Sequence, residues 1–322
     1  MKRRSFIAGL GSAAAWPLAA QAQAPLPVVG ILSGATFESM NALLAWFYPG
    51  LASEGFIENR NFTTQFRWAD DKYDRLPALA ADLVRRRVDL IVALGTTPGA
   101  LAAKAATQTI PIVFVVGTDP VEVGLVPSLA RPNGNVTGVT LLLVELLAKN
   151  LSLMHELVPS ASSIGVLINP VNPRQAAAET RDGQTAARML GVRLLALYAS
   201  TPSEIETAFE TLVREGAGGL VVTGEAFFFF QRDQIAALAA RYKVPATGFP
   251  GDGLLMTYGA NVADMYRQGG VYAGRILKGA NPADLPVVQP TKLQLIINMK
   301  TAKTLGITFP TGLLVRADEV IE

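Results

Sequence analysis

The sequence contains no cysteine and a single histidine, His155, among 322 residues. Without cysteine the chain cannot form a disulfide, react through a thiolate or carry a lipid on an N-terminal cysteine. Only 17% of the residues are charged and 50% are hydrophobic, which excludes a disordered chain and provides for large cores. Beyond the N-terminal segment, no stretch stays uncharged and apolar for the roughly 18 residues that a membrane helix needs.

Groups that carry catalysis are equally scarce. His155 lies near the end of an apolar helical run, where a packed or surface side chain is the simpler interpretation. No nucleophile elbow, phosphate loop or cluster of metal ligands is present. "GLGSAA" at 9–14 fits a dinucleotide pattern, but no strand precedes it and no βαβ unit surrounds it. We therefore predict no catalytic residue, no metal and no cofactor.

The first residues have the composition of an export signal. "MKRRSFIAGLGSAAAWPLAAQAQA" starts with three basic residues, continues through a mildly apolar stretch and ends in small residues. Arg3-Arg4 with the following Ser5–Ile7 resembles a twin-arginine motif, and an ordinary secretory signal is the alternative. We predict cleavage after about Ala22, because the next small-residue site would leave Pro25 first.

Removal of residues 1–22 takes away three positive charges and no negative ones, which leaves 25 basic and 26 acidic residues. A nearly neutral chain gives no reason to expect a nucleic-acid partner. We expect a soluble, monomeric protein in the periplasm, with no membrane insertion of the mature chain.

The mature chain alternates short β-rich runs with longer helical patterns. The runs predicted to be strands include 27–33, 61–68, 88–94 and 111–116, and the helical patterns include 39–54, 74–87 and the segment after Pro98. Such alternation is typical of parallel sheets that are covered by helices on both faces. The sequence therefore predicts an α/β fold.

Three landmarks recur in order. "VVGIL" from Val28 corresponds to "SIGVL" from Ser163, "LIVALG" ending at Gly95 to "GLVVTG" ending at Gly224, and Pro111 to Pro245. This repeat predicts two similar lobes. Ligands of parallel sheets lie beyond the carboxyl ends of the strands, so the loops after these strands should face a shared cleft. The candidate ligand-binding residues in these loops are Ser33, Gly34, Thr36, Gly95, Thr96, Thr97, Thr118, Asp119, Asn169, Asn172, Glu225 and Phe227.

Several of these residues have a purely structural alternative. Thr97 is expected at an N-cap with Pro98 at the first helical position, where it either caps the helix or also helps to bind a carboxylate. Asp119 either caps a turn or neutralises an ammonium group, and Glu225 is the other candidate for that partner. Asn169 and Asn172 either form turns or bind a polar ligand.

Four consecutive phenylalanines, Phe227 to Phe230, follow the strand that ends at Gly224. We expect Phe227 and Phe228 to face the cleft as an aromatic wall, and Phe229 and Phe230 to pack under the following helix. Burial of one phenylalanine contributes about 1.5–3 kcal/mol, so packing alone explains part of the block.

From Val28 to Glu322 the chain resembles the substrate-binding proteins of ABC transporters, in the branch that includes the tryptophan/tyrosine-type binding proteins. The resemblance is carried by 89–140, which begins "DLIVALGTTPGALAAKAAT", by "FFFFQRDQIAALAARYKVPA" at 227–246, and by 266–310, which begins "YRQGGVYAGRILKGANPADLP". Two departures are a phenylalanine, Phe230, in place of a polar capping residue, and a short "GFPGDG" before "GLLMTYG". They suggest a more open rim and a different specificity.

The resemblance implies two Rossmann-like lobes with parallel sheets, of the periplasmic binding protein type I-like fold, joined by three hinge crossovers. It implies a first lobe of 26–138 plus 258–290 and a second of 139–257 plus 291–322. The implied crossovers lie near 138–140, 258–259 and 289–292. The ligand contacts that it implies are Thr96, Thr97, Asp119, Asn169 and the loop that starts at Glu225.

We therefore predict a periplasmic receptor that binds an amino acid-like or other carboxylate ligand and delivers it to ABC permease subunits in the inner membrane. A two-domain enzyme that uses a nucleotide is one alternative, although the mature chain lacks the glycine fingerprint. A subunit that presents its ligand to a membrane sensor is another.

Overall fold

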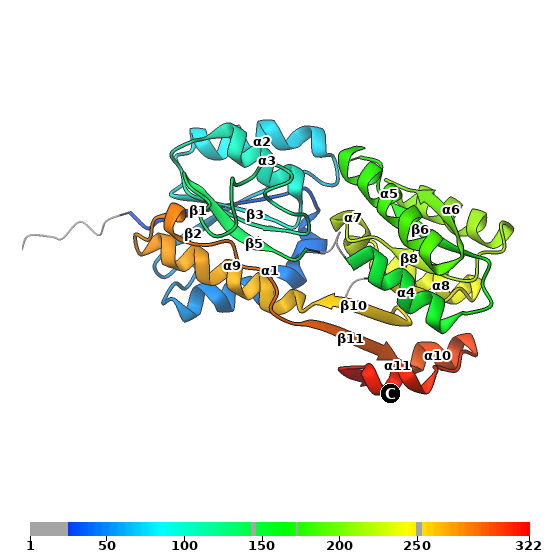
Figure 1. Ribbon diagram of the computed structural model, residues 1–322. Coiled ribbons are helices and arrows are strands. Elements are labelled where there is room, and N and C mark those ends of the chain that lie inside the picture. The colour runs from blue at the N-terminus through cyan, green and yellow to red at the C-terminus, as the bar shows by residue number, and fades with distance from the viewer. Residues whose placement is uncertain (1–24, 143–145, 172, 249–252) are drawn as a thin grey trace, which may run out of the picture.

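The computed structural model describes residues 25–142, 146–171, 173–248 and 253–322, which form two α/β lobes (Figure 1). The first lobe contains a sheet of buried, apolar strands. Its strands are β1 (Val28–Ser33), β2 (Thr63–Trp68), β3 (Leu90–Leu94), β4 (Ile112–Val116) and β5 (Val136–Thr140). They are all parallel, in the order β2-β1-β3-β4-β5. Every residue of β3, β4 and β5 is buried, as expected for parallel strands covered on both faces.

Helices cover both faces of this sheet. They are α1 (Phe37–Ser53), α2 (Leu76–Arg85), α3 (Thr97–Ala106) and α9 (Val262–Leu277), with a short 3₁₀ turn, η1 (Tyr73–Arg75), before α2. The helices α2 and α3 pack on one face, and α1 and α9 on the other (Figure 1). Because α9 comes from much later in the chain, the first lobe is built from separate segments.

The backbones of α1 and α9 approach each other at glycines. A Cβ atom at Gly50 would overlap the carbonyl oxygen of Arg267, and one at Gly270 would overlap the carbonyl oxygen of Phe47. Only glycine permits this approach without moving a helix. The contact holds α9 against α1 on one face of the first sheet. The chain enters α9 directly from the second lobe.

The second lobe contains a larger sheet. Its strands are β6 (Ser163–Ile168), β7 (Arg193–Tyr198), β8 (Leu220–Val222), β9 (Ala246–Gly248), β10 (Met256–Ala260), β11 (Leu293–Asn298) and β12 (Glu319–Ile321). Their order is β12-β11-β10-β9-β8-β6-β7. The β10–β11 pair is antiparallel and the other pairs are parallel.

The helices of the second lobe divide between the two faces of its sheet. They are α4 (Leu147–Leu157), α5 (Pro173–Leu190), α6 (Pro202–Arg214), α7 (Ala226–Phe230), α8 (Arg232–Tyr242), α10 (Met299–Leu305) and α11 (Thr311–Arg316). One core contains residues of α4, α5, α10 and α11, and the other contains residues of α6, α7 and α8. The predicted fold, two Rossmann-like lobes with parallel sheets, is confirmed.

The chain passes between the lobes three times. The first passage follows β5, the second joins β10 of the second sheet to α9 of the first lobe, and the third precedes β11. The sequence places the first two at 138–140 and 258–259. They lie slightly later in the structure, because β5 continues to Thr140 within the first sheet and β10 continues to Ala260 within the second.

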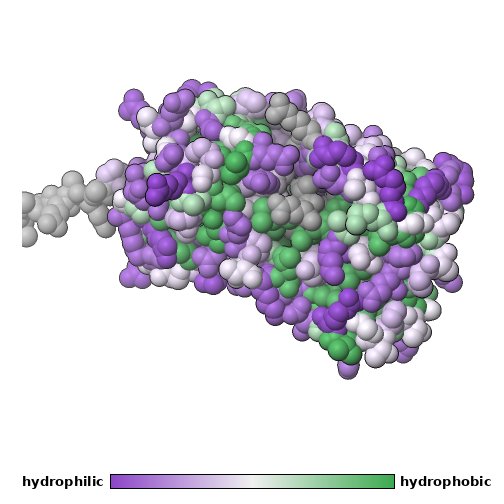
Figure 2. Space-filling model, viewed as in Figure 1, coloured by the Kyte–Doolittle hydropathy of each residue, from purple (hydrophilic) through white to green (hydrophobic). Residues whose placement is uncertain are grey.

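On the face shown in Figure 2, hydrophilic residues cover much of both lobes, and hydrophobic residues gather near the junction between them. Among the described residues, no helix combines the length and the apolar character that crossing a membrane requires.

Candidate functional site

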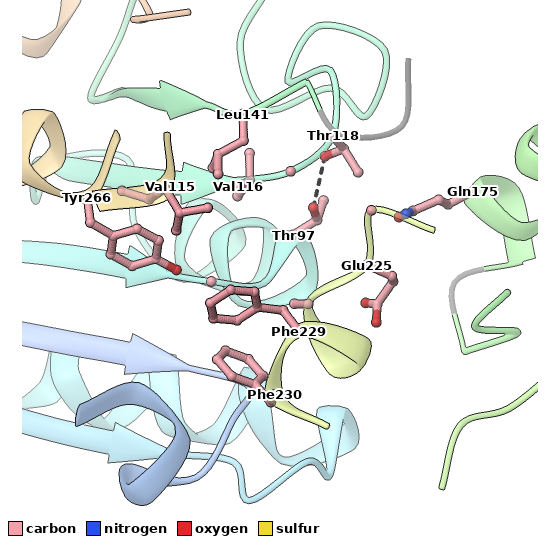
Figure 3. A pocket seen from close by; sticks show the side chains of 15 residues that line it. Thr97, Val115, Val116, Thr118, Leu141, Gln175, Glu225, Phe229, Phe230 and Tyr266 are labelled. Atoms are coloured by element: carbon pink, nitrogen blue, oxygen red, sulfur yellow. Dashed lines mark hydrogen bonds between the residues drawn. The ribbon is translucent and has the colours of Figure 1, made fainter. Parts of the chain in front are cut away.

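A cavity lies between the two lobes, with an empty volume of about 530 Å³ that includes open space at its mouth (Figure 3). The first lobe contributes Gly95, Thr97, Val115, Val116, Gly117, Thr118, Leu141, Val262 and Tyr266. The second lobe contributes Gln175, Gly224, Glu225, Ala226, Phe229 and Phe230.

The turn after β3 brings two of the predicted residues to the cavity. Gly95 has a φ of 83°, which suits glycine, and Thr97 is the first residue of α3. The hydroxyl groups of Thr97 and Thr118 lie 2.8 Å apart and are hydrogen-bonded (Figure 3). These two hydroxyl groups form the polar part of the first-lobe wall.

The predicted capping of this helix is wrong by one residue. The N-cap is Thr96, whose side chain makes no capping hydrogen bond. Its hydroxyl group instead accepts a hydrogen bond of 3.2 Å from the backbone N–H of Gly34. Thr97 is already helical, so its side chain turns toward Thr118 rather than back onto the helix start.

The predicted residues of the loop after β1 do not line the cavity. Ser33 is buried and its hydroxyl group accepts a hydrogen bond from the N–H of Ala35, while Thr36 caps α1 by accepting one from Ser39. Gly34 lies so close to the ring of Tyr73 that a Cβ atom would overlap it. These residues hold the turn in place.

Asp119 caps a turn, which is the first of the two roles that the sequence allowed. Its Oδ1 accepts hydrogen bonds from the backbone N–H groups of Val121, at 2.7 Å, and Glu122, at 3.4 Å. Its side chain does not line the cavity. The structure therefore gives it a local role in the turn after β4.

The turn after β8 carries a buried carboxyl group. Glu225 is only 6% exposed and is the N-cap of α7, where its Oε2 accepts a hydrogen bond of 2.7 Å from the N–H of Phe227. Asn169 Nδ2 donates a second hydrogen bond of 2.9 Å to the same oxygen. Burial raises the pKa of Glu225, against the lowering effect of these two bonds.

Asn169 forms a turn, which is the structural alternative, and its side chain also bonds to Glu225. Its Oδ1 accepts a hydrogen bond of 3.0 Å from the N–H of Val171, which fixes the turn after β6, and its amide orients Glu225. It does not line the cavity. Asn172, the other predicted asparagine of this turn, lies outside the described residues, as does 249–252 of the short "GFPGDG" segment.

A second buried acid stands behind this wall. Gln175 lines the cavity, and its Nε2 donates a hydrogen bond of 2.9 Å to Oε1 of Glu179, which is 1% exposed. The buried hydroxyl group of Thr223 lies beside this carboxyl group and, as a donor to it, favours its charged form. Burial, with the charge of Glu225, raises the pKa of Glu179 to about 7.

The four phenylalanines divide in the opposite way to the prediction. Phe227 and Phe228 are 4% and 0% exposed and belong to the core of the second lobe. Phe229 and Phe230 line the cavity and pack against the core of the first lobe (Figure 3). The reason is that all four lie within the single helical turn α7, so that the second pair is rotated across the cleft.

The sequence analysis missed the apolar residues of the first-lobe wall. Val115 and Val116 end β4, and Leu141 follows β5, so the rule that ligands lie beyond strand ends could have found them. Tyr266 and Val262 come from α9, which reaches the cavity only because it packs on α1. Their spacing in the sequence gives no such signal.

The residues that line the cavity include one acid and no lysine, arginine or histidine among the part of the chain that is described. His155 lies elsewhere, on α4, and no group of three or more histidine and acidic side chains among the described residues could hold a metal ion. The site can therefore exclude water, offer hydroxyl groups at one side, and present a carboxyl group and aromatic rings at the other.

Comparison with known proteins places this arrangement in context. A family model described as ABC transporter substrate binding protein matches residues 28–321. A tyrosine-binding protein of Clostridioides difficile is 30% identical over 283 residues, which cover 86% of this chain and 80% of that protein.

Solved structures share the fold. A conserved domain protein from Vibrio cholerae has 26% identity and a TM-score of 0.82, over 91% of this chain and 99% of that one. An ABC domain in complex with L-Trp from Streptococcus pneumonia has 24% identity and a TM-score of 0.78, over 91% and 100%.

A ligand-free, open structure of a substrate-binding protein with adhesive properties from Clostridium difficile has 26% identity but a TM-score of 0.62, over 92% and 99%.

Proposed function

Because the chain belongs to the family of ABC transporter substrate-binding proteins, we propose that it is the periplasmic receptor of an ABC importer. It binds an aromatic amino acid or a close analogue in the cavity between the lobes and delivers it to permease subunits in the inner membrane. The family consists of solute-binding proteins rather than enzymes.

The observation that carries this proposal is the pairing of a buried carboxyl group with aromatic side chains in one cavity. The carboxylate of Glu225 neutralises the ligand's ammonium group, and the ligand's ring packs against Phe229, Phe230 and Tyr266. The ligand's carboxylate lies at the N-terminus of α3, near Thr97, where free backbone N–H groups and the helix dipole favour an anion.

Relatives support the aromatic class. One relative is named a tyrosine-binding protein and one structural neighbour holds L-Trp. The alternative of an enzyme that uses a nucleotide has no support in the family. The remaining alternative, a subunit that presents its ligand to a sensor, uses the same cavity and differs only in its membrane partner.

Ligand identity is tested by native mass spectrometry of the freshly purified chain, followed by calorimetry with tyrosine, tryptophan, leucine and glutamate. We expect a co-purified aromatic compound, and tighter binding of the first two amino acids than of the last two. Equal affinity for leucine and tryptophan would contradict the aromatic site.

Transport is tested in cells. Deletion of the gene should abolish uptake of the ligand at low concentration, and the intact gene should restore it. Normal uptake in the deletion strain, with loss of a signalling response to the same ligand, would favour the sensor subunit.

Export is proposed from the sequence of residues 1–22, which lie outside the described residues. If the signal uses the twin-arginine route, changing Arg3 and Arg4 together to lysine should leave the precursor in the cytoplasm. Normal processing of this double variant would assign the signal to the general secretory route.

A further inference from the structure

We infer that the second-lobe end of the cavity is a subsite for a protonated amine, and that the protein binds aromatic amines without a carboxylate group. This inference rests on the proposed function, because it concerns the same cavity and takes the aromatic ring of the ligand as given. The inference limits the ligands to compounds that carry an amine. It also means that binding does not require a carboxylate group on the ligand.

Glu225 supplies the first part of the subsite. Its carboxyl group lines the cavity, and the hydrogen bonds from Asn169 and from the N–H of Phe227 both end on Oε2. The second oxygen, Oε1, takes part in neither of these two bonds, and the backbone N–H of Ala226 is a further donor to the carboxyl group. A buried carboxylate that is held by neutral donors alone gains most from a cationic partner.

Glu179 supplies the second part. It is 1% exposed, and Gln175, which lines the cavity, connects it to the ligand space. Its carboxyl group is buried beside the hydroxyl group of Thr223, which is a donor for it. Glu179 is therefore a second acid behind the cavity wall, connected to the ligand space through Gln175.

The charges near this end include one further acid and one cation. The charges of Glu225 and Asp71 both act on Tyr73, which the first lobe contributes, and the charge of Asp71 also acts on Glu225. The guanidinium group of Arg232 lies over the ring of Phe229 but does not line the cavity. Among the described residues that line the cavity, Glu225 is the one acid and none is a lysine, arginine or histidine, so a protonated amine is the ion that the ligand space lacks.

The opposite end offers less to a carboxylate. The hydroxyl groups of Thr97 and Thr118 are hydrogen-bonded to each other, and that of Thr96 is used by Gly34. Pro98, at the start of α3, has no N–H to donate. An anion there meets a helix N-terminus with a partial charge of roughly +0.5, whereas an amine at the other end meets the carboxyl group of Glu225.

Three ligands that share an indole ring separate the two ends. L-tryptophan carries both charged groups, tryptamine carries only the amine, and indole-3-propionate carries only the carboxylate. Calorimetry with the mature chain should give a Kd for tryptamine within about tenfold of that for tryptophan. The Kd for indole-3-propionate should be at least about 100-fold higher, because its carboxylate is buried without a cation.

Variants assign the preference to the subsite. Glu225→Gln should remove most of the difference between tryptamine and indole-3-propionate while it keeps the size of the side chain. Glu210→Gln, the same change at an exposed position on α6, should leave all three affinities unchanged. Thermal unfolding of each variant checks that it is folded. If Glu225→Gln does not fold, Gln175→Ala replaces it and should weaken tryptamine binding more than indole-3-propionate binding.

The outcomes are distinct. If tryptophan binds but tryptamine does not, or indole-3-propionate binds as tightly as tryptamine, this inference is wrong and the proposed function stands. If none of the three indoles binds, both fail together. Preference for the two amines, lost in Glu225→Gln, supports the inference.

Discussion

The turns after β3 and after β8 occupy equivalent places in the two lobes, yet they carry opposite chemistry. After β3, Thr96 precedes a helix of 10 residues without a capping hydrogen bond to its side chain, and Thr97 offers a hydroxyl group to the cavity. After β8, Glu225 caps a helix of 5 residues through its own carboxyl group and brings Phe229 and Phe230 across the cleft.

The comparison shows how one scaffold makes an asymmetric site. Both turns have free N–H groups at a helix start, which favour anions. In the second lobe the carboxyl group of Glu225 accepts from this N–H position, so the wall of the cavity presents an acid there instead of N–H groups. The polarity of the cavity therefore depends on which residue caps each helix.

The largest expected effect tests whether Phe228 is a core residue and Phe230 a cavity residue. Phe228→Ala removes a fully buried ring from the second-lobe core and should lower the free energy of unfolding by about 3–5 kcal/mol. Phe230→Ala should cost clearly less stability and should instead weaken ligand binding. Urea denaturation and calorimetry of both variants check this. Equal losses of stability would mean that Phe230 is also a core residue.

The next effect tests the acid of the second turn. Glu225→Ala should weaken binding of the ligand by about 100-fold, because a buried ammonium group would lose its partner. Asp119→Ala serves as the matched control and should bind like the parent, since Asp119 only caps a turn. Calorimetry with both variants decides. A loss confined to Asp119→Ala would reverse the roles of the two acids.

The acid behind the second turn should make stability depend on pH. The pKa of Glu179 is raised from 4.5 to about 7, so the folded state keeps a proton that the unfolded state loses. Its contribution to stability therefore falls as pH rises from about 4.5 to 7, and stays low above that. Glu179→Gln mimics the protonated form and should stabilise the protein by about 3 kcal/mol at pH 8.

At pH 4 the same variant should have little effect, because the carboxyl group is then protonated in both states. Thermal unfolding of parent and variant at both pH values measures the difference in their stability. Both proteins contain Glu225, so the effect of its titration largely cancels in this difference. An equal stability change at pH 4 and pH 8 would show that Glu179 does not titrate as stated.

The smallest effect tests the hydroxyl groups of the first turn. Thr97→Val keeps the shape of the side chain and removes its bond with Thr118, which should weaken binding by about 0.5–1.5 kcal/mol. A double-mutant cycle with Thr118→Val measures the coupling of the two residues. Additive losses would show that each hydroxyl group contacts the ligand independently.

Much of the fold could be predicted because buried parallel strands appear as short apolar runs, and the repeat from Val28 to Ser163 gives two lobes. The position of the cavity could also be predicted, because strand ends place Gly95, Thr97, Thr118 and Glu225 on its wall.

The remaining errors have physical causes. A block of four identical side chains has no periodicity, so nothing in it distinguishes the buried pair from the pair at the cavity. A sequence places the start of a helix only to within a residue or two, so the N-cap was expected at Thr97 and is Thr96 in the structure. Tyr266 and Gln175 reach the cavity through the packing of whole helices, which single-sequence patterns do not record.

The contact between α1 and α9 also affects the order in which the protein folds during synthesis. The side of α1 that faces α9 includes Phe47 and Gly50, and its partner Gly270 is made more than 200 residues later. The ribosome therefore completes most of the second lobe while the first lobe still lacks a helix. An export route that accepts only folded chains would have to wait for this last helix, whereas a route that threads unfolded chains would not.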